Sequence, residues 1–179
     1  MRSWVITSCV ALAFTGCAWF GIGPSVTVYA TPTETLRAAT SAFRHFDIPV
    51  VWQDARRGRL SSGPFTVEES WGGESLANRV DCGEEGGRPR VERGIVELRV
   101  DLEISTRRVR DGGFLSGGVV GTVPVESGRR REVARVSIDS SGRLYTPEGK
   151  THSCRLTMEF AKRVIEYVAQ LAGGTHSVP

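Results

Sequence analysis

The chain has 179 residues, of which 23 are Lys or Arg and 20 are Asp or Glu, and its formal net charge is +3. A length in this range is typical of one domain with a sizeable hydrophobic core. The two signs of charge are interspersed without a clustered basic patch, which argues against a protein that binds nucleic acid.

The N-terminus has the form of an export signal. Arg2 precedes an apolar run over residues 4–14, which is shorter than the roughly 20 residues needed to span a bilayer. The run ends in Phe14-Thr15-Gly16-Cys17, which resembles the lipobox of bacterial lipoproteins. The resemblance implies cleavage before Cys17 and attachment of fatty acids such as palmitate to this cysteine. An ordinary signal peptide cut near Ala18 and a buried N-terminal helix are the alternatives.

This interpretation divides the chain into four parts. We expect a signal peptide over 1–16, a lipid anchor and tether over 17–30, a single domain over 31–172 and a flexible tail over 173–179. In enteric bacteria an Asp after the lipidated cysteine marks retention in the inner membrane. The residue here is Ala18, so the resemblance implies anchoring in the outer membrane with the domain facing the periplasm.

The predicted tether is apolar. Trp19, Phe20 and Ile22 are expected near the membrane interface, which suits aromatic side chains, or else in an apolar tether. A short apolar patch at 26–29 is consistent with an edge strand.

The first clear element is a helix. Thr31 and Glu34 form a capping box around Pro32, and proline is well suited to the first helical position. Apolar residues then recur at helical spacing up to Phe43. We expect the helix to end near Phe46, because Pro49 restricts the residues before it.

A hairpin follows the helix. Residues 48–52 are predicted to form a strand, 54–58 a turn, and 59–67 a second strand that Gly63-Pro64 kinks or places at an edge. Residues 68–93 are polar and rich in Gly and Glu, and they are predicted to form a long loop.

Two further strands are predicted. Apolar and charged residues alternate over 95–104, which indicates one face on a core and one in water. Residues 111–130 are Gly-rich and are expected to form a flexible loop. A strand over 132–138 is then expected to end at Ser140-Ser141-Gly142.

The last predicted element is a helix that begins between Ser153 and Thr157 and stops at Gly173-Gly174. Strands grouped between two helices predict an α+β fold. We expect an antiparallel sheet of about four strands, with a helix before it and the long C-terminal helix packed on one face.

This order of elements also resembles a known architecture. A lipobox, a helix, a hairpin containing Trp52 and Gly58-Arg59-Leu60, paired strands and a closing helix are similar to the helix-grip domains of the C-subunit lipoprotein of the β-barrel assembly machinery. The similarity covers roughly residues 31–171. It implies a curved antiparallel sheet around the C-terminal helix, and a role accessory to outer-membrane assembly.

The cysteines are consistent with export. Cys9 would leave with the signal and Cys17 would be acylated, so Cys82 and Cys154 remain. Two cysteines left in an oxidising compartment usually pair, which predicts a disulfide bond. The alternative is a pair of buried free thiols.

No motif of catalysis, cofactor binding or metal binding is found in the sequence. His152 lies close to Cys154, but such near neighbours rarely have the geometry of an activated thiolate. The pairs Glu68-Glu69 and Glu84-Glu85 are interpreted as solvated surface. We therefore expect a non-enzymatic lipoprotein with an envelope protein as its partner. The alternative is a small-molecule or lipid-binding module with a pocket between the sheet and the C-terminal helix.

Overall fold

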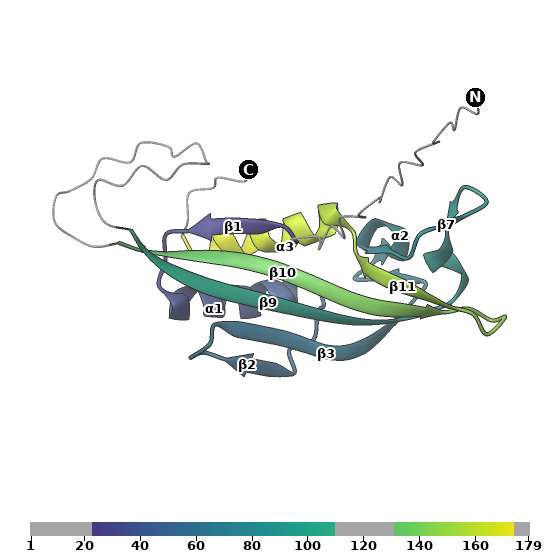
Figure 1. Cartoon of the computed structure of the whole chain (residues 1–179), viewed down its shortest axis with the longest axis horizontal. Helices are drawn as coiled ribbons and strands as arrows, with labels where there is room; N and C mark the ends of the chain where they lie inside the picture. The colour runs from purple at the N-terminus through teal and green to yellow at the C-terminus, as the bar shows by residue number, and fades with distance from the viewer. Residues whose placement is uncertain (1–22, 110–130, 174–179) are drawn as a thin grey trace, which may run out of the picture.

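The computed structural model describes residues 23–109 and 131–173. Two long antiparallel strands, β9 (Ile95–Val109) and β10 (Arg131–Tyr145), run along the molecule. The helices α1 (Pro32–His45) and α3 (Met158–Leu171) pack on the sheet and on each other (Figure 1). The predicted α+β class, with an antiparallel sheet and a packed C-terminal helix, is confirmed.

The sheet is larger than predicted. Within the described residues it has nine strands in the order β5-β4-β3-β9-β10-β11-β6, with β1 beside β10 and β2 beside β3. The expected number of about four was therefore wrong. The further strands are β1 (Ser25–Val28), β2 (Trp52–Asp54), β3 (Arg59–Glu68), β4 (Ser70–Trp71), β5 (Glu74–Ser75), β6 (Val80–Asp81) and β11 (Thr151–Leu156).

Helix α1 begins and ends where the sequence predicts. The Thr31 hydroxyl accepts a hydrogen bond from the Glu34 amide at 3.3 Å, and the Glu34 carboxylate accepts one from the Thr31 amide at 3.0 Å. The Thr31 hydrogen bonds also lower the pKa of Glu34. The helix is capped at its C-terminus by Phe46.

The alternation predicted for 95–104 is confirmed in β9. The alternating apolar residues from Val96 to Ile104 are buried on the side of the helices, while Glu97, Arg99 and Glu103 are exposed. The neighbouring hairpin turns at Gly58, which has a φ of +62°. The pairing of β3 with β9 shifts between Ser61 and Pro64, so the predicted irregularity at Gly63-Pro64 is also confirmed. The buried set of β9 is Val96, Leu98, Val100, Leu102 and Ile104.

The segment 68–93 is not a loop. It holds β4, β5 and β6, the short helix α2 (Leu76–Arg79), the hairpin of β7 (Glu84–Glu85) with β8 (Arg88–Pro89), and a 3-10 turn over Arg90–Arg93. Each element is only two to four residues long, so none is long enough for a hydrophobic pattern to repeat. Trp71, Leu76 and Val91 in this segment are nevertheless buried in the core.

Several predicted boundaries are also corrected. Strand β10 continues through Ser140-Ser141-Gly142 to Tyr145. At Gly142 a side chain would collide with the Glu97 carbonyl of β9, so the glycine permits close strand packing rather than ending the strand. Residues 151–156 form strand β11, and α3 begins after the capping residue Thr157.

At the N-terminal end, residues 25–28 lie in the predicted tether, yet they form β1 and pair with β10, as the edge-strand interpretation predicted. The predicted signal peptide over 1–16, Cys17, the segment 111–130 for which a loop was predicted, and residues 174–179 of the predicted tail lie outside the described residues. None of the described helices is both long and apolar enough to cross a bilayer.

Candidate functional site

The edge of β10 changes partner partway along its length. Residues 134–137 pair with β1, whereas residues 142–145 pair with β11. After Cys154, strand β11 turns away and pairs instead with β6 through Arg155 and Leu156. Within the described residues, no strand pairs with the edge of β10 between Ser137 and Gly142, and the sheet forks at this point.

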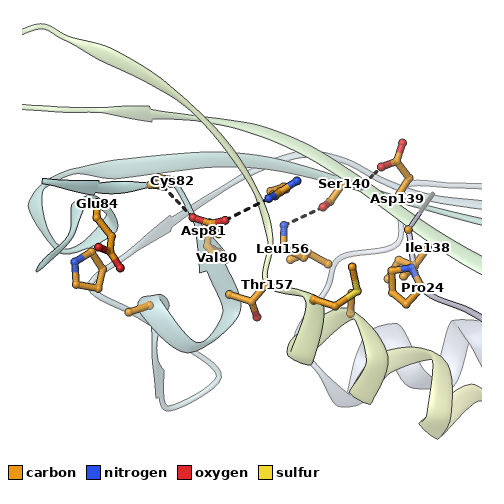
Figure 2. A pocket seen from close by; sticks show the side chains of 17 residues that line it. Pro24, Val80, Asp81, Cys82, Glu84, Ile138, Asp139, Ser140, Leu156 and Thr157 are labelled. Atoms are coloured by element: carbon orange, nitrogen blue, oxygen red, sulfur yellow. Dashed lines mark hydrogen bonds and ion pairs between the residues drawn. The ribbon is translucent and has the colours of Figure 1, made fainter. Parts of the chain in front are cut away.

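A cavity of about 390 Å³ lies in this fork, and we call it the fork pocket. Figure 2 shows that its walls come from the residues just before β1, from β6 and the residues after it, from β10 and β11, and from the start of α3. Val80, Ile138, Leu156, Met158 and Ala161 make its floor apolar.

Acidic groups lie around the pocket. Asp81, Glu84 and Asp139 line it together with a single basic residue, Arg155. The Asp81 carboxylate accepts a hydrogen bond from the Gly83 amide at 2.9 Å and lies 3.6 Å from the Arg155 guanidinium. The pocket thus combines an apolar floor with a net acidic rim.

The hydroxyl groups of the pocket have structural roles. The Leu156 amide donates a hydrogen bond to the Ser140 hydroxyl at 2.8 Å (Figure 2), which satisfies a backbone group that the fork leaves without a strand partner. The Thr157 hydroxyl donates to the Asn78 carbonyl at 2.8 Å and accepts from the Phe160 amide at 3.2 Å. Both hydroxyls are thus hydrogen-bonded to backbone groups of the fork and of the start of α3.

The predicted pair Cys82 and Cys154 forms a disulfide bond. The bond joins the end of β6 to β11, and Cys82 lines the fork pocket. It therefore closes the side of the fork where β11 has left β10. His152 lies 3.3 Å from Arg90, and a sulfur held in a disulfide cannot serve as a thiolate partner for this histidine.

A second group of residues, which we call the arginine cluster, connects α2 and β5 to α3. The Glu74 carboxylate accepts hydrogen bonds from Arg163 at 2.8 and 3.2 Å and from Arg79 at 3.4 Å. Arg79 is 4% exposed, and its guanidinium lies over the rings of Phe160 and Trp71, 4.7 and 5.2 Å from their centroids. The hydrogen bonds from Arg163, and then from Arg79, lower the pKa of Glu74 from 4.5 to about 2.

This pKa makes a prediction about acid stability. Because the folded-state pKa lies below the ordinary value of 4.5, the charged Glu74 stabilises the fold above about pH 4.5, and this contribution is lost as the pH falls toward 2. Glu74→Gln should lower the free energy of unfolding at pH 7 by about 1 kcal/mol, a small value because the carboxylate is partly exposed. Urea unfolding at a series of pH values should show the difference from the unmodified protein closing in acid. Glu97→Gln, on the exposed face of β9, should show no such trend.

The fork pocket and the arginine cluster were not predicted. The pocket's polar residues come from three separate stretches around residues 81, 139 and 155, and the cluster joins residues 74 and 79 to residue 163. No short motif contains either set. The exposed pair Glu84-Glu85, interpreted as surface, contributes Glu84 to the pocket. A possible signal was the apolar spacing of Trp71, Leu76 and Val80 inside the supposed loop.

Among residues 23–109 and 131–173, no group of three or more His, Cys, Asp and Glu side chains could hold a metal ion. Comparison of the chain with protein-family models, with curated proteins and with solved structures finds no match.

Proposed function

We propose that the protein is a non-enzymatic lipoprotein of the bacterial cell envelope that acts through contacts with another envelope protein. The observation that carries the proposal is the Cys82–Cys154 disulfide, because such bonds persist in oxidising compartments. An exported protein needs a signal, and the N-terminal pattern that ends in Gly16-Cys17 supplies one that includes an acylation site.

The geometry of the first strand supports a domain held close to the membrane. The described chain enters the fold at Gly23, six residues after Cys17. Six residues span at most about 20 Å when fully extended. If Cys17 carries the lipid, the fork pocket, which Gly23 lines, lies within this distance of the bilayer surface. Envelope partners would approach the domain beside the membrane.

Anchoring in the outer membrane and a role accessory to outer-membrane assembly are the finer parts of the proposal. They are supported by Ala18 after the cysteine and by a fold in which an antiparallel sheet packs on a C-terminal helix. Cross-linking in intact membranes, followed by identification of captured proteins, tests the role. Reproducible capture of assembly components would support it, and repeated failure to capture any protein would contradict it.

The anchor has a direct test. Cys17→Ser should abolish lipid labelling and either move the protein to the soluble fraction or leave it unprocessed, because no thiol remains to be acylated. Metabolic labelling with a fatty acid, followed by membrane fractionation, measures both effects. Cys9→Ser, which changes a cysteine inside the predicted signal, is the matched control and should keep both the label and the membrane location. Unchanged labelling of Cys17→Ser would refute the anchor.

The alternative is a small-molecule or lipid-binding module. The centre of the interface between sheet and helix does not favour it, because Phe160, Val164, Leu98 and Val100 are all buried there in one continuous core. The fork pocket does favour it, since this cavity touches both β10 and the start of α3. Native mass spectrometry of protein extracted from membranes would distinguish the two functions, because a retained lipid or metabolite supports the alternative.

A further inference from the structure

The path of the chain at the fork is constrained by its first described residues. The Pro24 carbonyl accepts a hydrogen bond from the Ile138 amide at 3.4 Å, so β1 stays close to β10 up to this point. At Gly23 a side chain would collide with the Ile138 carbonyl, which explains the glycine. Beyond it, the hydrogen bond from the Leu156 amide to the Ser140 hydroxyl brings β11 against β10. The described pairing of the N-terminal segment with β10 therefore begins at Pro24, beside the fork.

Two cavities lie at the first described residue, since Gly23 lines both of them. The fork pocket has the apolar floor described above. The second cavity, of about 460 Å³, includes the apolar residues Trp52, Leu60 and Leu102, but a larger share of its lining is charged than in the fork pocket. The charged residues that β3 and β9 contribute to it are Arg59, Arg99, Asp101 and Glu103. Burial of an apolar segment is therefore more favourable in the fork pocket than in the second cavity.

The segment that precedes Gly23 is apolar. Residues 18–22 read Ala-Trp-Phe-Gly-Ile and carry no charge. Ile22 adjoins a residue of the pocket wall, and three extended residues carry Phe20 at most about 10 Å from Gly23. Burying a large apolar side chain is favourable by about 1.5–3 kcal/mol. Because residues 18–22 are joined directly to Gly23, their binding to the pocket would be intramolecular.

We propose that the fork pocket is the docking site of the chain's own linker, residues 18–22, whose apolar side chains cover the floor formed by Leu156, Met158 and Ala161. The docked linker holds the domain at a defined orientation to the lipid on Cys17. This inference rests on the proposed function, because only cleavage before Cys17 makes these residues a linker between lipid and domain.

The test places a photoreactive p-benzoylphenylalanine at position 20 of the full chain, expressed in cells, and irradiates intact membranes. Mass spectrometry of the digested protein then locates the cross-link. We expect an intramolecular link to residues of the fork pocket such as Met158. The mass of the N-terminal peptide in the same sample reports whether Cys17 is processed and lipidated, so failure of the anchor is seen separately from failure of docking.

Two comparisons make the expectation quantitative. The same photoreactive residue at Leu171 lies at the far end of α3, roughly 20 Å along the helix from the pocket, and should give no link to pocket residues. Ile22→Asp should reduce the yield from position 20 about tenfold or more, because a charged side chain in an apolar cavity costs at least about 1.4 kcal/mol. Ile22→Leu should preserve the yield.

Three results would overturn the proposal. One is a link from position 20 to membrane lipid or to another protein, which would make the linker a membrane or partner contact. Another is a link to Trp52 or its neighbours in the charged cavity. The last is a yield at pocket residues no higher than that obtained from position 171.

Discussion

Replacing both Cys82 and Cys154 with Ala should lower the free energy of unfolding by about 4 kcal/mol. The two cysteines lie 72 residues apart, and a cross-link of this length removes many conformations from the unfolded chain. In the folded chain it also fastens β6 to β11 at the fork, where only residues 80–81 and 155–156 pair between these strands. Urea unfolding of the oxidised protein and of the double variant measures the difference.

The matched control is the unmodified protein after reduction, which keeps both side chains and removes only the bond. It should lose nearly the same free energy as the double Ala variant. If the free energy of unfolding of the variant falls by less than about 1 kcal/mol, the disulfide adds little to the stability that the pairing of β6 with β11 already provides. The loop-closure argument would then fail for this chain.

Phe160→Ala should lower the free energy of unfolding by about 3–5 kcal/mol. Phe160 is fully buried, its ring packs edge-on against Phe46 and Trp71 at 5.5 and 5.1 Å, and both arginines of the arginine cluster lie over it. Removing the ring would leave a cavity where α3, α1 and β4 meet and would deprive Arg79 of an aromatic partner.

Leu171→Ala provides the control on the same helix. Leu171 is 47% exposed, so its truncation should change the free energy of unfolding by less than about 0.5 kcal/mol. Phe160→Leu retains most of the apolar volume and loses the ring face, so it should lie between the two variants. An effect of Phe160→Ala below about 1 kcal/mol would show that α3 does not depend on this contact.

Elements with a complete local pattern could be predicted from the sequence. Helix α1 has its capping box at Thr31 and Glu34 and four turns of apolar spacing, so its start and its end near Phe46 follow from local physics. The alternation in 95–104 likewise predicted which side chains of β9 face the core. In both cases the hydrophobic pattern spans a whole element, with polar residues facing solvent and apolar residues facing the core.

Elements too short for a hydrophobic pattern to repeat could not be predicted. The strands β4, β5 and β6 and the helix α2 have two to four residues each, and they form because neighbouring parts of the fold supply their partners. Strand β11 shows the same effect, because residues 151–156 acquire a defined structure from their pairing with Tyr145–Gly142 and with β6. Local composition at 140–142 suggested a strand end, whereas the packing of Gly142 on β9 permits β10 to continue.

The candidate site shows the same difference between features set by local sequence and features set by tertiary contacts. The disulfide could be predicted because counting the cysteines that remain after a predicted export signal requires no knowledge of distance. The fork pocket could not be predicted, because it exists only where β10 exchanges one partner strand for another and where β6 approaches β11.

The sequence by itself determined the fold class, the capped helix, the long amphipathic strand and the cysteine pairing, since each depends on residue types or on spacing within one segment. Only the tertiary structure decided where β11 leaves the sheet, which carboxylates surround the resulting cavity and how Arg79 and Arg163 reach Glu74, because these depend on residues far apart in the chain that approach one another only after the sheet and helices have packed.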